Sequence, residues 1–180
     1  MSIAALRTLP LLACLAACAS QPPAPPEPPP PPVPAQTQDR GGVPRISLPP
    51  AQAPAEGQDN KSAPYRFADS VELELTPRSA GAWSRWDEGT DRWRLDLHSP
   101  GATSLNLHFD RFALPPGASL KLYDPSAPAQ SLTLSAADNK PHGQLWTPQI
   151  RGDTLRLDLR LPASAGRQVG LKLKTVNIAW

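Results

Sequence analysis

Hydrophobic residues fall at every second position over most of this chain after residue 70. The pattern begins in VELEL at residues 71–75, returns in WRLDL at 93–97 and is longest in LRLDLRL at 155–161. Successive side chains of a β-strand point to opposite faces, so this period predicts strands with one buried and one solvated face. No stretch shows a convincing helical period, and the chain is therefore predicted to be all-β.

Turn-forming residues separate the predicted strands. The segments SPGA, LPPGA, YDPSAPA, RGD and PASAGR supply proline, glycine, aspartate and serine at intervals typical of antiparallel sandwiches. About eight strands with polar outer faces predict an antiparallel two-sheet β-sandwich of jelly-roll type. The parity of the alternation changes near Thr175, which predicts a β-bulge in the last strand.

Proline dominates the sequence before this domain. Fifteen of the 25 prolines lie between Pro22 and Pro64, where large hydrophobic residues are nearly absent. Such a composition cannot build a core, so residues 18–64 are predicted to be a disordered proline-rich tether and residues 65–180 the β-sandwich domain. The alternative role for the prolines is a ligand for an aromatic groove.

The first residues have the features of an export signal. Arg7 precedes an apolar run that is too short to span a bilayer. The run ends in LAAC at residues 15–18, which resembles the lipobox of bacterial lipoprotein signal peptides. The resemblance implies a signal peptide at 1–17 and a palmitate-type lipid on Cys18, with an ordinary cleavage site as the alternative. Because Ala19 is not the aspartate associated with inner-membrane retention, the expected location is the cell envelope, at the outer membrane.

The sequence offers little for catalysis. Its three histidines are scattered, no Gly-x-Ser-x-Gly motif occurs, and Cys14 falls within the predicted signal peptide. We therefore expect no enzyme activity, no catalytic residue and no metal or other cofactor. Turn aspartates give calcium as a minor alternative to turn capping; they are Asp110, Asp124, Asp138 and Asp153.

Net charge is +2, with basic and acidic residues interleaved along the predicted strands. No basic stripe is expected from this distribution, which disfavours nucleic acid and anionic lipid as partners. Arg151-Gly152-Asp153 is interpreted as a turn that leads into the strand at Thr154, and not as an adhesion tripeptide.

Two parts of the domain are candidates for a binding surface. Trp83 and Trp86 lie in GAWSRWDEG, a loop-like stretch, where exposed indoles could stack on sugar rings or anchor a protein. Packing over the end of the sandwich is the alternative, whereas Trp93 shares the parity of core residues. The second candidate is ADNKPHGQLWTP, which ends at Pro148 and is expected to be a turn closed by Leu145 and Trp146; its candidate surface residues are Asp138, Asn139 and His142.

The segments WRLDLHSPGATSLNLHFDRFALPPGASLKLYDP, AADNKPHGQLWTPQIRGDTLRLDLRLP and VGLKLKTVNIAW carry a family resemblance. They resemble the N-terminal non-catalytic module of bacterial lysyl-endopeptidase-type secreted serine proteases, in which a similar β-rich module precedes a trypsin-like catalytic domain. LNLHFDRFALPPGASLKLYD is also similar, more loosely, to CUB and proprotein-convertase P-type jelly rolls. No residue of the catalytic triad can be transferred, because in that family the catalytic domain follows the position of Trp180. The resemblance implies a stand-alone accessory module.

The sequence therefore predicts a non-catalytic envelope lipoprotein whose sandwich binds a protein partner. By the resemblance, that partner is a secreted protease whose folding or activity the module assists or inhibits. The alternative is a glycan or cell-wall-binding module that uses exposed Trp83 and Trp86. A remnant of a truncated protease gene and a hydrolase using Asp138 or His142 are weaker alternatives.

Overall fold

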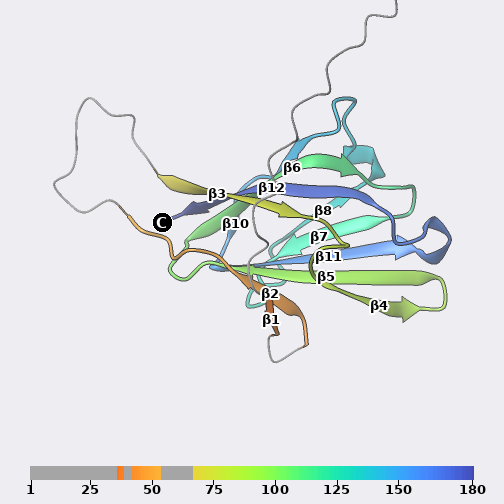
Figure 1. The fold of residues 1–180 in the computed structure, drawn as a ribbon, viewed down its shortest axis with the longest axis horizontal. Helices are drawn as coiled ribbons and strands as arrows, with labels where there is room; N and C mark the ends of the chain where they lie inside the picture. Colours follow the sequence, from red (N-terminus) through yellow and green to blue (C-terminus); the bar gives the residue numbers. More distant parts are fainter. Residues whose placement is uncertain (1–35, 39–41, 54–66) are drawn as a thin grey trace, which may run out of the picture.

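The computed structural model describes residues 36–38, 42–53 and 67–180, which form two packed β-sheets (Figure 1). The predicted signal peptide, Cys18 and most of the predicted tether lie outside the described residues. No helix in the described part is long and apolar enough to cross a membrane. The helical elements there are two 3-10 turns, η1 (Ala136–Asp138) and η2 (Ala163–Ala165).

The larger sheet has seven strands in the order β1-β2-β5-β11-β7-β8, with β4 paired to β5 beside β2. All its pairs are antiparallel except β2 with β5. Its strands are β1 (Gln36–Gln38), β2 (Pro44–Ser47), β4 (Ala82–Asp87), β5 (Thr90–His98), β7 (Ser119–Tyr123), β8 (Ser131–Ser135) and β11 (Thr154–Pro162).

The smaller sheet has five strands, all paired antiparallel, in the order β10-β6-β12-β3, with β9 also paired to β6. The predicted irregularity near Thr175 is confirmed, because the register of β12 shifts between Leu173 and Thr175. The strands are β3 (Ala68–Leu75), β6 (Ser104–Ala113), β9 (Leu145–Trp146), β10 (Ile150–Arg151) and β12 (Gly170–Ala179).

The strand order is that of a jelly roll. When β1, β2 and β4 are set aside, the first strand (β3) pairs with the last (β12), and the second (β5) with the next to last (β11). The third strand, β6, pairs with β9 and β10, while β7 pairs with β8 as a hairpin. Each of these nested pairs lies in the opposite sheet from the previous one. The predicted antiparallel β-sandwich is therefore confirmed.

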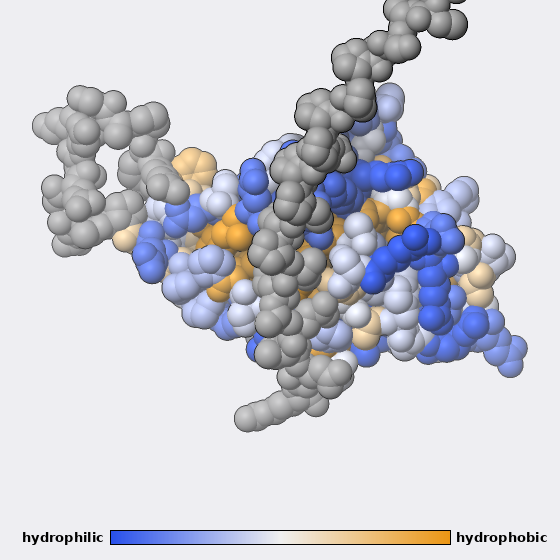
Figure 2. Space-filling view, viewed as in Figure 1, coloured by the Kyte–Doolittle hydropathy of each residue, from blue (hydrophilic) through white to orange (hydrophobic). Residues whose placement is uncertain are grey.

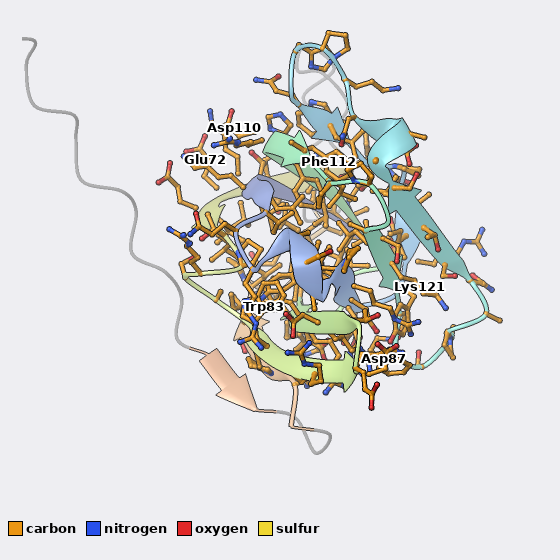
Figure 3. The ribbon with its side chains drawn as sticks, turned by 90° about the vertical axis from the view of Figure 1, so that its right-hand side faces the viewer. Glu72, Trp83, Asp87, Asp110, Phe112 and Lys121 are labelled. Carbon is orange, nitrogen blue, oxygen red and sulfur yellow. The ribbon has the colours of Figure 1, made fainter. Side chains whose placement is uncertain are left out.

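The core consists of the inward-facing residues of both sheets, and most of them are leucines at the predicted alternating positions. Leu95, Leu107 and Leu159 are fully buried, and Trp93 is buried as predicted. Outward-facing residues are mostly polar, and hydrophilic colours cover much of the described surface in Figure 2. In Figure 3, Glu72 and Asp110 lie on one outer side of the sandwich and Lys121 on the opposite side.

The folded part begins earlier than residue 65. The strand β2 lies within the segment that was expected to be a disordered tether, yet it pairs with β5, and Ile46 and Leu48 are buried in the core. The amide of Leu48 also donates to the carbonyl of His98. The prediction of a tether from 18 to 64 is therefore wrong for residues 36–38 and 42–53, because a short strand needs few hydrophobic residues when an existing sheet edge supplies its hydrogen bonds.

Candidate functional site

The tryptophan pair occupies a strand, and not the loop that its sequence suggested. Trp83 and Trp86 both belong to β4, which forms a hairpin with β5. Trp83 is opposite the buried Trp93, packs against the core and donates from Nε1 to the carbonyl of Pro77 at 2.9 Å. Trp86 is three residues further on and 48% exposed. The two indoles therefore lie on opposite faces of the strand and cannot form one coplanar platform.

Trp86 forms the edge of a cluster of arginines on the outer face of the seven-stranded sheet. The guanidinium carbons of Arg92 and Arg160 lie 4.5 Å and 4.2 Å from the centre of its ring. These two arginines are direct cross-strand neighbours on β5 and β11. Cations over an indole face are attracted by the ring quadrupole, so Trp86 and the arginines hold one another in place.

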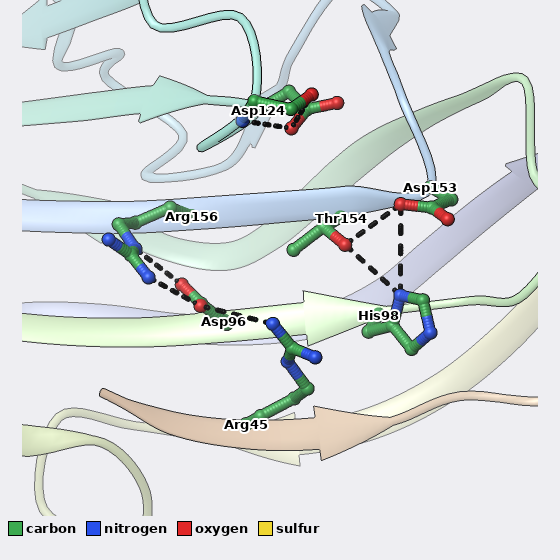
Figure 4. Close-up of polar contacts among 8 residues, drawn as sticks. Arg45, Asp96, His98, Asp124, Asp153, Thr154 and Arg156 are labelled. Carbon is green, nitrogen blue, oxygen red and sulfur yellow. Dashed lines mark hydrogen bonds and ion pairs between the residues drawn. The ribbon is translucent and has the colours of Figure 1, made fainter. Parts of the chain in front are cut away.

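Two buried carboxylates, Asp96 and Asp158, fix arginines on the same face. Asp96 on β5 is fully buried and accepts two hydrogen bonds of 2.7 Å from Nε and Nη2 of Arg156, its neighbour on β11 (Figure 4). Arg45 on β2 approaches the same carboxylate at 4.0 Å from the other side. Such two-pronged pairing fixes the orientation of a guanidinium group better than a single contact.

Asp158 on β11 fixes an arginine in the same way as Asp96, in the next row of side chains across the sheet. It is 3% exposed and accepts hydrogen bonds from Nε and Nη2 of Arg92, the former at 2.8 Å. These bonds raise the pKa of the Arg92 guanidinium, although its burial acts in the opposite direction. Because the pKa of Arg92 is raised in the folded state, the stabilisation by this ion pair is fully present below the ordinary pKa of arginine. It is lost only as the pH rises through the raised pKa, so Arg92 stays charged under physiological conditions.

Together these residues form what we term the arginine face. Strand register places six cationic side chains and two buried carboxylates on it. The cations are Arg45, Arg92, Arg94, Arg156, Arg160 and Lys121, and the carboxylates are Asp96 and Asp158. The expectation that no basic stripe forms is wrong here, because charges two residues apart along a strand share a face. The sequence pattern that indicates this face is present in RWRLDL and LRLDLR, where the positions between the leucines are arginine or aspartate.

The loop after β8 is held by its own hydrogen bonds. The Asp138 carboxylate caps η1 by accepting from the amide of Ser135 at 2.8 Å. Asn139 bonds both the amide and the carbonyl of Leu114, each at 2.9 Å. His142 is exposed, and its Nδ1 accepts from the amide of Gln144 at 3.1 Å.

These three residues do not join the tryptophans in one surface. The loop follows β8, at the opposite edge of the seven-stranded sheet from β4. The sequence-predicted candidates are therefore split between separate places, and the loop residues serve mainly to fix their own turn.

Trp146 does not close the core as expected. It is 55% exposed and stacks on the ring of His108, with centroids 4.1 Å apart and planes 9° from parallel. The stack lies on the outer face of the five-stranded sheet, where β9 pairs with β6. The indole predicted to pack against the core is therefore exposed, with one face covered by an imidazole.

A hydroxyl, an imidazole and a carboxylate meet where β5 ends and β11 begins. Thr154 Oγ1 donates to Asp153 at 2.9 Å and lies 3.0 Å from Nδ1 of His98 (Figure 4). Asp153 approaches the same nitrogen at 3.8 Å. A hydrolytic triad needs the third group on the other ring nitrogen, so this cluster lacks the geometry to activate a nucleophile.

The loop aspartates expected as calcium alternatives have other contacts. Asp124 accepts from the amide and the hydroxyl of Ser126, and Asp110 lies 3.8 Å from Lys172. Among the described residues, no group of three or more acidic, histidine or cysteine side chains is placed to hold a metal ion. Gly152 of the RGD segment has φ +121°, and the turn leads into β11 at Thr154 as predicted.

Comparison with known proteins identifies one family. The family model described as the lysyl endopeptidase N-terminal domain matches residues 48–177, which include β3 to β11 and most of β12. No solved structure matches the chain.

Proposed function

Because this chain belongs to the family of the lysyl endopeptidase N-terminal domain, we propose that it is a non-catalytic module that binds a protein partner through its arginine face. The family domain is the N-terminal part of the protease and not its catalytic part. The function therefore depends on a surface that recognises another molecule.

The observation that carries the proposal is the arrangement of Trp86 against Arg92 and Arg160 on the outer face of the seven-stranded sheet. Tryptophan and arginine are the residues most enriched at the energetic centres of protein interfaces. Arg92 and the neighbouring Arg156 are fixed by the buried carboxylates Asp158 and Asp96, so little of their side-chain entropy is lost when a partner binds. An excess of cations on the face favours a partner with an acidic surface, and it would also increase the association rate at low salt.

The partner that family membership favours is a secreted serine protease of the lysyl endopeptidase type. A module that binds the catalytic domain could assist its folding or inhibit its activity. We also propose that Cys18 attaches the chain to a membrane of the bacterial envelope, so that the module acts at the cell surface or in the periplasm.

The proposal can be tested by surface plasmon resonance with the full chain and an inactive lysyl endopeptidase catalytic domain without its own N-terminal domain. We expect Trp86→Ala to weaken binding at least about tenfold, since loss of an interface hot spot costs about 2 kcal/mol or more. Raising salt should slow association.

Trp146→Ala, on the opposite sheet, is the matched control and should bind like the parent chain. Equal binding by the parent and Trp86→Ala would rule out the arginine face as the interface. Binding of duplex DNA as tight as that of the protease would show only a nonspecific polyanion effect, and would contradict a specific protein interface.

A further inference from the structure

The outer face of the five-stranded sheet has a different chemistry from the arginine face. Strand register aligns four uncharged side chains in one row. Three of them lie on β3, β12 and β6, and the fourth is the residue before β10. Asn177 is paired with Ser70 on one side and with Asn106 on the other, and Gln149 continues the row. We term this surface the amide face.

A hollow of about 450 Å³ lies over this row. It is lined by Phe67, Ser70, Ser104, Asn106, Gln149 and Asn177, together with two alanines, and none of its lining residues is charged. A second hollow shares Ser104 and Gln149 with it and continues toward Arg151. Its lining residues place the hollow at the end of the sheet where β3 begins and β12 ends. These strand ends are on the left in Figure 1. Its volume is within the range of about 300–1,000 Å³ that small-ligand sites occupy.

The side-chain amides in the hollow have donors and acceptors that are not used in hydrogen bonds to described residues. The side chains of Asn106 and Gln149 have no hydrogen bond to another described residue, and Asn177 uses only its oxygen, which accepts from Ser70 at 2.6 Å. Each amide group offers two donors and an acceptor, which matches the mixed donor and acceptor character of sugar hydroxyl groups.

Aromatic rings flank the amides. Phe67, at one side of the hollow, is 58% exposed. In the next row along β6, about 7 Å away, His108 carries the exposed ring of Trp146. An indole whose inner face is covered by an imidazole presents its outer face to solvent, where the apolar face of a sugar ring can stack.

Charged side chains of both signs lie beside the first hollow but do not line it. Glu72 lies in the same row as His108 and Trp146, with Thr175 between Glu72 and His108. Lys172 is paired with Glu74 at 3.0 Å and is 3.8 Å from Asp110. Arg111 is the register partner of Lys172, and Arg151 lines the second hollow. Cations and carboxylates therefore both lie beside the first hollow but none lines it, so its amides suit an uncharged ligand.

We propose that the amide face binds an uncharged oligosaccharide, with the hydroxyl groups bonded to Asn106, Asn177 and Gln149 and one ring stacked on Trp146. Two adjoining hollows with common lining residues fit an oligosaccharide better than a monosaccharide. This inference does not depend on the protein-binding role of the arginine face, which is on the other sheet.

The experiment is isothermal titration calorimetry of the full chain with cellotetraose and with chitotetraose, and with heparin as the anionic comparison. We expect saturable binding of at least one neutral tetrasaccharide. The double variant Asn106→Ala, Asn177→Ala should weaken it about tenfold, since two neutral hydrogen bonds are lost. Trp146→Ala should weaken it by a similar factor through loss of stacking.

Two control variants keep the test specific. Gln144→Ala is a nearby exposed substitution outside the hollow, and Trp86→Ala removes the indole of the arginine face; both should bind sugar like the parent. Thermal unfolding of each variant establishes that it is folded. Failure of the folded parent to bind either neutral sugar, binding of heparin alone, or sugar binding that survives both sets of substitutions would each overturn the proposal.

Discussion

At the scale of residues, the main determinant of the candidate protein interface is the placement of carboxylates beneath arginines. Asp96 and Asp158 lie on the solvent side of a sheet, yet both are buried because arginine side chains cover them. The aliphatic parts of arginine can cover a polar group while the guanidinium remains partly exposed. Each carboxylate thus fixes the orientation of an arginine at the surface, where a partner can bind it.

This arrangement predicts a large effect for removal of one carboxylate. Asp96→Ala leaves Arg156 without its two-pronged partner, and removal of one member of a buried ion pair costs about 3–5 kcal/mol. Because Arg156 and Arg45 are partly exposed, we expect a loss of about 2–4 kcal/mol in the free energy of unfolding, measured by urea denaturation.

The control for this prediction is Asp153→Ala. The Asp153 side chain is half exposed, so its loss should cost less than about 1 kcal/mol. If the two variants were equally stable, the buried pair would contribute no more than a surface pair, and the account of the arginine face as preorganised would be wrong.

Residue spacing also decides which tryptophan is available for binding. Trp83 and Trp86 are three positions apart, and an odd spacing within one strand puts side chains on opposite faces. In a loop, as GAWSRWDEG suggests by its composition, spacing carries no such meaning. Once β4 is recognised as a strand, one tryptophan belongs to the core and the other to the surface.

At the scale of elements, β2 changes where the domain begins. It has only four residues and is surrounded by prolines, so neither its length nor its composition indicated a strand. Its pairing with β5 is the only parallel one among the described residues, and the strand lies along the part of the β5 edge that β4 does not cover. Its hydrogen bonds and its buried side chains both depend on a surface formed by distant sequence.

Ile46 tests whether β2 is part of the cooperative fold. Its side chain is fully buried, so Ile46→Ala should lower the free energy of unfolding by about 2–5 kcal/mol. Ser47→Ala, an exposed position on the same strand, should change it by no more than about 0.5 kcal/mol.

Urea unfolding followed by tryptophan fluorescence measures both variants. If Ile46→Ala were as stable as the parent, residues 42–53 would be a tether, as the composition alone indicated, and the domain would begin near residue 65.

At the scale of the whole molecule, the two sheets present outer faces of contrasting chemistry. The arginine face is cationic and has Trp86 at its edge, whereas the amide face is uncharged over its hollow and has Trp146 beside it. The proposals therefore assign a protein partner to one side and a sugar to the other. A module of this kind could hold a secreted enzyme close to a polysaccharide.

Membrane attachment is the remaining prediction about the whole chain. We expect the chain to incorporate radiolabelled palmitate when it is produced in a bacterium with lipoprotein processing, because LAAC at residues 15–18 matches a lipobox. Cys18→Ala removes the acceptor thiol and should abolish the label, while Cys14→Ala should leave it unchanged. Label that persists in Cys18→Ala would exclude Cys18 as the lipidation site.

The sequence by itself determined the fold class and most of the core. Alternation of leucine with polar residues marks β5, β6 and β11 because the side-chain period of a strand is a local property of the backbone. The bulge near Thr175 followed from a change of parity in the same pattern. The family resemblance rested on those strands and the turns between them, and the family match confirms it.

Only the tertiary structure decided which residues share a surface. The arginine rows require the pairing of β5 with β11, which are separated by more than fifty residues, and the amide row requires β3, β6 and β12 to be neighbours. The hydrophobicity of Trp146 predicts burial, but no strand of the described part packs over its outer face and it is exposed. Sequence alone could not predict these surfaces because the burial of a side chain depends on which residues pack against it. In a jelly roll, nested strand pairing supplies those residues from distant parts of the sequence.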